Sequence, residues 1–202
     1  MSGLMIVVSG PAGSGKGTVN AHLINGGDFV YSVSATTRAP RPGEKDGVNY
    51  YFITKEEFEQ RIASGDMLEY TQYCGNYYGT PRKEAMEVLK SGKNLILEIE
   101  VEGAMTVKRK CPDSVLIMLL PPSYEVQEQR LRGRGTETED KILARLKRTK
   151  EEVVMLPDYD YIVYNEDGKA EESARMIEQI VCAERHAVKR NAGAIEAYFK
   201  KN

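Results

Sequence analysis

The N-terminal end of the chain places the strongest constraint on its fold. An apolar run, residues 4–9 (LMIVVS), leads into a glycine-rich stretch, residues 10–17 (GPAGSGKG), and a helix-compatible segment follows. The run is too short for a helix of its own, so the pattern predicts a strand, a loop and the first turn of a helix. Glycines let the backbone N–H groups of such a loop converge, and the helix dipole adds partial positive charge. The segment therefore predicts a phosphate-binding loop.

Lys16 brings a full positive charge to the end of this loop, where it can reach the outer phosphates of a nucleotide. The next residue is usually Ser or Thr, whose hydroxyl binds Mg²⁺, but this chain has Gly17 followed by Thr18. We therefore expect phosphate oxygens and water to hold most of the Mg²⁺ coordination, with Thr18 on an inner phosphate. The sequence specifies no protein ligand for the metal.

The composition is that of a globular protein in water. Of the 202 residues, 41% are hydrophobic and 29% are charged, which suits one domain with a substantial core. The longest apolar run, Val115 to Leu120, is far shorter than a membrane span of roughly 20 residues, and the N-terminus lacks a signal-peptide pattern. A net charge of −2 argues against binding of long nucleic acid. We expect a cytoplasmic protein with neither membrane nor nucleic-acid partners.

Cysteine and histidine chemistry is not expected. The three cysteines, Cys74, Cys111 and Cys182, are far apart and odd in number, so we expect them to be reduced. The two histidines, His22 and His186, lie in helix-like stretches and offer neither a zinc site nor a nucleophilic triad.

A second anion site is predicted within residues 31–53. This stretch contains Arg38 and Arg41, two prolines and a glycine turn, and then an aromatic strand that includes Tyr50. Two guanidinium groups and a phenol can close on a phosphate that the first loop does not hold. The alternative is a basic turn exposed to solvent.

Two carboxylates, Glu98 and Glu100, come at the end of a second buried strand (residues 93–100, KNLILEIE). The carboxyl ends of parallel strands face the crevice in which such sheets bind ligands, so we expect both carboxylates beside the phosphate-binding loop. A solvated strand end is the alternative. Two further strands are predicted at residues 115–120 and 160–165, and the second of these ends in Asn165.

Arginines and glycines alternate in residues 130–140 (RLRGRGTETED), between two predicted helices. The second helix also carries Arg145 and Arg148. A lid over a triphosphate needs cations that arrive when it closes and glycines that let it move. The segment therefore predicts a lid, and the alternative is an ordinary pair of charged helices with solvated arginines.

Taken together, these segments resemble the guanylate kinase family over nearly the whole chain. Its most specific marks are three stretches in the right order and spacing: 34–41 (SATTRAPR), 75–80 (GNYYGT) and 132–138 (RGRGTET). The resemblance implies an α/β fold with a three-layer P-loop core around a central parallel sheet, a GMP-binding lobe with a small mixed sheet, and a helical lid. It assigns the core to residues 1–31, 83–125 and 159–202, the lobe to 32–82 and the lid to 126–158.

The implied reaction is phosphoryl transfer from ATP to GMP, and also to dGMP, with Mg²⁺ accompanying ATP. The implied GMP contacts are Ser34, Arg38, Arg41, Tyr50, Glu69, Tyr78, Thr80, Glu98 and Glu100. Guanine suits Glu69, because an ionised carboxylate can accept both the N1–H and the N2 amino group, while a hydroxyl of Ser34 or Thr80 can donate to O6. Adenine would set its N1 lone pair against the same carboxylate.

ATP contacts are implied along the first loop and in the lid. They are Gly10, Pro11, Ala12, Gly13, Ser14, Gly15, Lys16, Gly17, Thr18, Arg130, Arg134 and Asn165, the last near adenine. The implied catalytic residues, which stabilise charge while a GMP phosphate oxygen attacks the γ-phosphorus in line, are Lys16, Arg38, Arg134 and Arg145. This chain departs from commoner family forms at Ala12, where serine is frequent, and at its glutamates 98 and 100, where aspartates often occur.

Two other functions share many of these features. A guanylate-kinase-like module of a scaffold protein would bind phosphorylated peptides without catalysis, but this chain retains Lys16, Arg134 and Arg145. A kinase for another nucleoside monophosphate would share the phosphate-binding loop and should lack the pair of Glu69 and Ser34. The sequence leaves the oligomeric state open between a monomer and a small homo-oligomer.

Overall fold

A five-stranded parallel sheet forms the centre of the molecule in a computed structural model, which describes residues 2–133, 135 and 138–200. The strand order is β2-β7-β1-β8-β9, and every neighbouring pair is parallel. The strands are β1 (Met5–Ser9), β2 (Phe29–Tyr31), β7 (Asn94–Glu98), β8 (Val115–Leu120) and β9 (Tyr161–Tyr164). Short unbroken apolar runs form these strands because both faces of a parallel sheet are covered.

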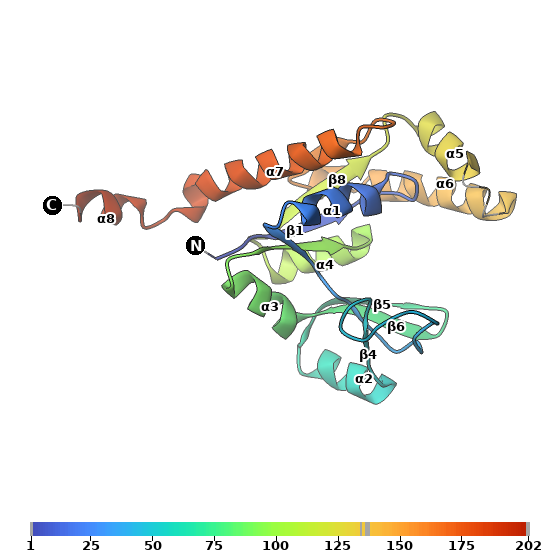
Figure 1. The fold of residues 1–202 in the computed structure, drawn as a ribbon, viewed down its shortest axis with the longest axis horizontal. Coiled ribbons are helices and arrows are strands. Elements are labelled where there is room, and N and C mark those ends of the chain that lie inside the picture. Colours follow the sequence, from blue (N-terminus) through green and yellow to red (C-terminus); the bar gives the residue numbers. More distant parts are fainter. Residues whose placement is uncertain (1, 134, 136–137, 201–202) are drawn as a thin grey trace.

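Helices cover both faces of this sheet and complete three layers (Figure 1). Successive strand residues point to opposite faces, so Ile6 and Val8 enter one hydrophobic core while Met5 and Val7 enter the other. The first core includes side chains of α1 (Lys16–Asn25) and α7 (Ala170–His186), and the second those of α3 (Arg82–Lys90) and α4 (Val101–Lys110). The phosphate-binding loop therefore leaves a strand that is rigidly packed on both sides.

A second, smaller sheet lies below the core in Figure 1. Its order is β4-β3-β6-β5, with β3 and β4 parallel and the other pairs antiparallel. The strands are β3 (Ala35–Thr36), β4 (Tyr51–Phe52), β5 (Met67–Tyr73) and β6 (Asn76–Pro81). Helix α2 (Lys55–Ala63) buries Phe58 against this sheet, and the hydroxyl of Thr54 caps it by accepting the backbone N–H of Glu57 at 3.1 Å.

Two helices, α5 (Tyr124–Gly133) and α6 (Glu139–Val153), form a pair that projects from the carboxyl end of the central sheet (Figure 1). Leu131, Ile142 and Leu146 form a small core of their own between them. The predicted fold is confirmed: a central parallel sheet, a separate mixed sheet and a helical pair over the phosphate-binding loop. Arg134, which was predicted to bind ATP, lies outside the described residues.

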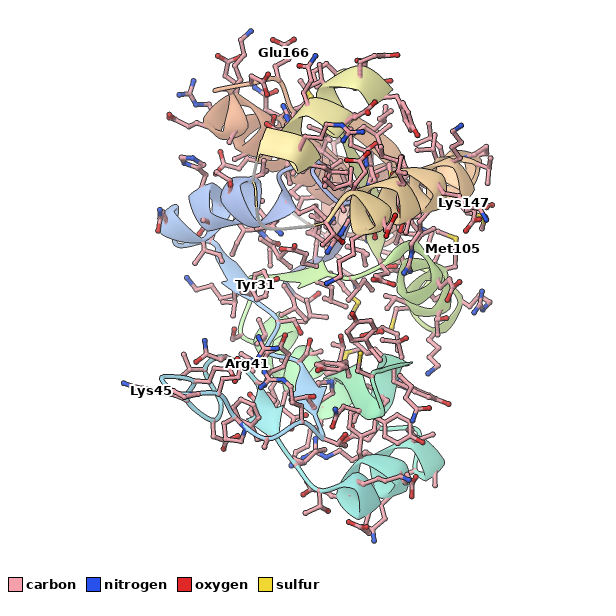
Figure 2. All side chains as sticks on the ribbon, turned by 90° about the vertical axis from the view of Figure 1, so that its right-hand side faces the viewer. Tyr31, Arg41, Lys45, Met105, Lys147 and Glu166 are labelled. Carbon is pink, nitrogen blue, oxygen red and sulfur yellow. The ribbon has the colours of Figure 1, made fainter. Side chains whose placement is uncertain are left out.

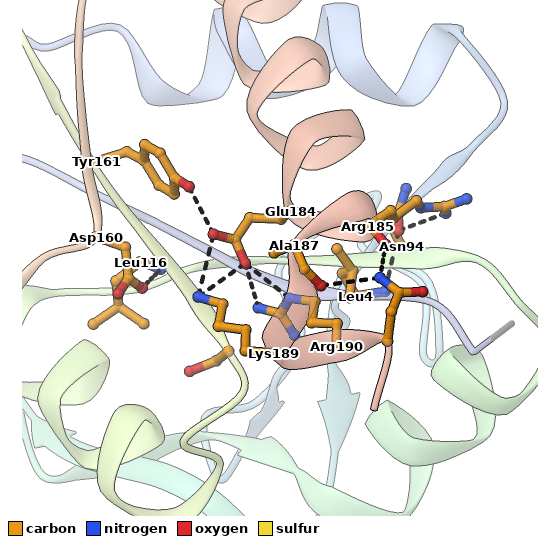
Figure 3. A network of polar contacts seen from close by, with 12 residues as sticks. Leu4, Asn94, Leu116, Asp160, Tyr161, Glu184, Arg185, Ala187, Lys189 and Arg190 are labelled. Carbon is orange, nitrogen blue, oxygen red and sulfur yellow. Dashed lines mark hydrogen bonds and ion pairs between the residues drawn. The ribbon is translucent and has the colours of Figure 1, made fainter. Parts of the chain in front are cut away.

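The C-terminal end of α7 is fastened to the opposite end of the sheet by the buried carboxylate of Glu184 (Figure 3). Glu184 accepts hydrogen bonds from the Tyr161 hydroxyl at 2.6 Å and from Arg190 at 2.8 Å, and Lys189 approaches it at 3.3 Å. Burial opposes its ionisation, but these donors outweigh burial and lower the pKa of Glu184 to about 2. The chain then continues through η2 (Val188–Arg190) into α8 (Ala194–Phe199), which extends away from the body (Figure 1).

The three cysteines are free thiols, as predicted. In the part of the chain that the structure describes, no helix combines the length and the apolar character needed to cross a bilayer.

Candidate active site

The phosphate-binding loop connects β1 to α1 in a conformation that requires glycine. Gly10 and Gly15 have φ angles of 153° and 91°, which residues with a Cβ atom rarely adopt. A Cβ atom at Gly10 would lie 2.0 Å from the carbonyl oxygen of Leu119, and one at Gly15 would lie 2.2 Å from Nδ2 of Asn165. The glycines thus permit both the curl of the loop and its close packing on β8 and β9.

Lys16 is the first residue of α1 and curls back over the loop. Its ammonium group donates to the carbonyl of Gly10 and, at 3.3 Å, to that of Pro11. These contacts hold the positive charge against the loop at the carboxyl end of the sheet, where a polyphosphate chain would approach the backbone N–H groups.

Asn165 and Arg130 brace the same loop from the outside. The Asn165 amide donates to the carbonyl of Ser14 at 2.8 Å, and its own oxygen accepts the Ser173 hydroxyl at 3.3 Å. Arg130 on α5 donates to the carbonyls of Asn165 and Gly13 at 2.7 and 3.3 Å. Asn165 was predicted only as a neighbour of adenine, and the structure adds that its side chain fixes the loop.

A cleft of about 660 Å³ opens beside these residues. It is lined by Gly13, Gly15, Thr18, His22, Arg130, Gly133, Asn165, Glu166, Asp167, Gly168, Ala170 and Glu171. Five of these residues were predicted ATP contacts, and they come from the loop, α1, α5 and the end of β9, so the fold brings distant segments of the chain together here. Glu166 marks the upper edge of the molecule in Figure 2.

A second cleft, of about 440 Å³, lies between the small sheet and the segment from β7 to α4. Six of the predicted GMP contacts line it, namely Ser34, Tyr50, Glu69, Tyr78, Glu98 and Glu100. Its other walls are Tyr70, Thr71, Tyr73, Gly79, Ile99, Glu102, Gly103 and Thr106. Carboxylates, phenols and the hydroxyl of Ser34 thus converge in one cavity from five separate segments of the chain.

Glu69 is the most buried carboxylate of this cleft. The Thr80 hydroxyl donates to its Oε1 at 2.7 Å, and a Cβ atom on Gly103 would lie 3.1 Å from its Oε2, so glycine leaves room for the carboxylate. Burial raises the pKa of Glu69, while the hydrogen bonds from Thr80 and the charge of Lys110 favour the ionised form. Ser34 and Thr80 were the two hydroxyls predicted to donate to guanine. Because Thr80 donates its proton to Glu69, the hydroxyl of Ser34 is the one left for a ligand.

Arg38 lies at the margin of the cleft, with its guanidinium 5.6 Å from the centre of the Tyr50 ring. It donates to both carboxylate oxygens of Glu44, at 2.9 and 3.0 Å, and the backbone N–H of Arg41 donates to the same carboxylate at 2.7 Å. The hydrogen bonds to Glu44 raise the pKa of Arg38 and lower the pKa of Glu44. Sequence reasoning missed Glu44, because a carboxylate in a loop with two arginines has the same pattern whether it is paired or solvated.

Glu98, at the end of β7, lines the second cleft and is tied by hydrogen bonds to α1 and β2. Asn20 of α1 donates to Oε2 of Glu98 at 2.9 Å, and the Tyr31 hydroxyl donates to the same oxygen at 3.0 Å. Burial and the charge of Glu98 raise the pKa of Tyr31. Figure 2 shows Tyr31 where the chain leaves the central sheet and Arg41 in the loop below it. Asn20 and Tyr31 were also not predicted as site residues. The sequence signal for Asn20 is a polar residue on the buried face of α1.

No cluster of three or more His, Cys, Asp or Glu side chains able to hold a metal is found among residues 2–133, 135 and 138–200. Thr18 brings a hydroxyl to the cleft beside the loop, and Glu98 brings a carboxylate to the end of β7, the strand next to β1. This donor set fits a Mg²⁺ ion that arrives with nucleotide phosphates better than an ion held by the protein alone.

Comparison with known proteins gives a consistent result. A family model described as guanylate kinase matches residues 2–184. The chain is 50% identical to a guanylate kinase of Clostridioides difficile, covering 98% of this chain and 97% of that protein. It is 49% identical to one from Latilactobacillus sakei, covering 98% and 96%. The crystal structure of guanylate kinase from Anaplasma phagocytophilum is similar, with a TM-score of 0.76 and 34% identity over 99% of this chain and 95% of that one.

Proposed function

Since the chain belongs to the guanylate kinase family and phosphorylates GMP with ATP, we propose that the cleft beside the phosphate-binding loop takes ATP and that the cleft around Glu69 takes GMP. One observation carries this proposal: six residues predicted to contact GMP, the phosphoryl acceptor, line the second cleft. We call this cleft the acceptor site. Glu98, tied to α1 by Asn20, marks the boundary at which the two substrates would meet.

Guanine is read by a buried carboxylate in this proposal. Glu69 keeps Oε2 and one lone pair of Oε1 for the N1–H and N2 donors, because Thr80 uses only part of Oε1. Ser34 donates to O6, and Glu100 adds a second acceptor at the rim. None of these contacts depends on the ribose 2′-hydroxyl, so dGMP is a substrate as well.

The phosphate of GMP is bound by Arg38, Arg41, Tyr50 and Tyr78. The Tyr50 and Tyr78 rings lie edge to face at 6.0 Å, and Arg38 stacks on Tyr50, so three of the four donors are already mutually oriented. A phosphate oxygen then attacks the γ-phosphorus of ATP in line, without a covalent enzyme intermediate. Preoriented donors accelerate such a step because they need no reorganisation as charge develops.

On the ATP side, the backbone of residues 10–18 cradles the phosphates, Arg130 and Asn165 border the adenine cleft, and Lys16, Arg38, Arg134 and Arg145 stabilise the transferring group. Thr18 would lie near an inner phosphate, and Mg²⁺ bound with ATP would supply positive charge that offsets part of the charge of the phosphates. Arg134 and Arg145 fall within the stretch of sequence predicted to form the lid, residues 126–158, and closure of a lid would also exclude water.

We further propose the division into a core (1–31, 83–125, 159–202), a GMP-binding lobe (32–82) and a lid (126–158). A large hydrophobic cluster lies in the core, and the lobe and the lid each have a small one. We also propose a cytoplasmic enzyme, monomeric or a small homo-oligomer, without nucleic-acid or membrane partners. The slightly negative net charge of −2 supports the part of this proposal that concerns nucleic acid.

The test is steady-state ADP formation with Mg-ATP and, in turn, GMP, dGMP, AMP, CMP and UMP. We expect turnover with GMP and dGMP alone. Turnover with AMP or UMP would contradict the assignment of Glu69 and Ser34 to guanine, and turnover that survives in Lys16→Ala would contradict the assignment of the phosphate-binding loop.

A further inference from the structure

Arg148, on the outer helix α6, reaches across to the GMP cleft. Its Nη2 donates to Oε2 of Glu100, which lines that cleft. Its Nε donates to Oε1 of Glu152, one helical turn further along α6, at 3.1 Å. A single guanidinium therefore joins the helical pair over the phosphate-binding loop to the rim of the acceptor site.

Glu100 needs a partner of this kind to hold one orientation. Its backbone is fixed as the residue before α4, with φ −73° and ψ 163°, but its side chain is 63% exposed. Glutamate has one more rotatable bond than aspartate, so an exposed carboxylate at this position loses more conformational entropy on binding a ligand. Arg148 engages Oε2, which leaves Oε1 for a ligand in the cleft.

The other end of the bridge is anchored by Glu152. Its side chain is 15% exposed, against 51% for Arg148, so it forms the less mobile half of the pair. Burial raises the pKa of Glu152, and the positive charges of Arg148 and Lys16 oppose that rise, which places this carboxylate within the field of the phosphate-binding loop.

Arg148 and Glu152 line a hollow of about 440 Å³ between α4 and α6. Val101, Met105 and Arg109 of α4 face Arg148 and Glu152 across it. Figure 2 shows the two helices next to each other, with Lys147 of α6 labelled above Met105 of α4. Arg148 lines this hollow and bonds Glu100, so its side chain is a direct route by which the position of α6 can affect Glu100.

We propose that Arg148 is a positioning residue for the acceptor site: it orients Glu100 toward the guanine ring and so makes α6 contribute to GMP binding. The inference rests on the guanine contact proposed for Glu100. It predicts that loss of Arg148 weakens GMP binding while leaving the phosphoryl-transfer step and ATP binding nearly intact.

The test compares Arg148→Met, Arg148→Lys, Glu100→Gln and the double variant Glu100→Gln/Arg148→Met. Lys147→Met is the matched control, because it removes the same charge from the adjoining exposed position of α6. We expect Arg148→Met to raise the KM for GMP about threefold, the scale of a surface ion pair, with kcat changed by less than about twofold. Arg148→Lys should recover part of the loss, and Lys147→Met should behave as the parent protein.

The double variant decides whether Arg148 acts through Glu100. Its KM for GMP should equal that of Glu100→Gln alone. Effects that multiply, or an unchanged KM in Arg148→Met while Glu100→Gln is impaired, would overturn the inference and leave the proposed guanine contact standing. An unchanged KM in Glu100→Gln would remove Glu100 from the guanine site, and the inference with it.

Discussion

Arg38 donates from one guanidinium nitrogen to both carboxylate oxygens of Glu44, at 2.9 and 3.0 Å. Glu44 also accepts the backbone N–H of Arg41, so one carboxylate organises both arginines of the proposed phosphate site. An arginine held over Tyr50 by a fixed partner loses less entropy when it meets a phosphate than one that is free to rotate.

The first prediction therefore concerns Glu44. We expect Glu44→Gln to raise the KM for GMP about fivefold, because an amide holds the guanidinium less firmly by about 1 kcal/mol. The KM for ATP should not change. Steady-state kinetics with each substrate varied in turn will show this. A lower KM for GMP in the variant would mean instead that Glu44 competes with the substrate phosphate for Arg38.

Glu69 gives the second prediction. Replacing its carboxylate by an amide sets an N–H₂ group or a single oxygen against two guanine donors, a mismatch of about 2–3 kcal/mol. We expect Glu69→Gln to lower kcat/KM for GMP roughly 100-fold, with the KM for ATP within about twofold. Glu56→Gln, on the exposed side of α2, is the control. Equal losses in the two variants would remove Glu69 from guanine recognition.

How far the sequence predicts this structure depends on how local the signal is. The phosphate-binding loop and the Thr54 cap of α2 follow from residues within a few positions of each other, and both were predictable. The bonds from Asn20 to Glu98 and from Arg148 to Glu100 join residues 78 and 48 positions apart, and only packing reveals them.

Glu44 shows a different limit. It lies six residues from Arg38, yet a carboxylate among arginines has the same pattern whether it is solvated or structural. Asn165 was predicted beside adenine from the resemblance, but its bond to Ser14 depends on β9 lying beside the loop in space. Which residues line each cleft could therefore be predicted better than the partners that hold them.

The third prediction concerns stability at low pH. The pKa of Glu184 falls from its ordinary value of 4.5 to about 2 on folding, so its contribution is complete above the unfolded value and is lost as the pH falls from 4.5 toward 2. We expect Glu184→Gln to lower the free energy of unfolding by about 2 kcal/mol at pH 7, since it weakens the bonds to Tyr161 and Arg190.

Urea unfolding of the parent protein and the variant at several pH values measures this contribution. The difference between them should shrink between pH 4.5 and pH 3. Glu178→Gln, an exposed carboxylate on the same helix, serves as the control and should change stability by less than about 0.5 kcal/mol at pH 7. A pH-independent difference for Glu184→Gln would show that packing, not charge, accounts for its effect.

The fourth prediction sets two glycines of the phosphate-binding loop against each other. Gly15 has a φ of 91°, and an added Cβ atom would lie 2.2 Å from the Asn165 amide, whereas one at Gly17 would meet no atom within 4 Å. Gly15→Ala therefore forces either the loop or Asn165 to move, and we expect it to reduce kcat/KM for ATP at least 100-fold, the usual cost of a small displacement at a reacting centre. Gly17→Ala, which adds a methyl group in the first turn of α1, should stay within about fivefold and keep or raise the melting temperature. Comparable losses in both variants would mean that glycine is required here because the phosphates approach the backbone closely, and not because of the backbone conformation.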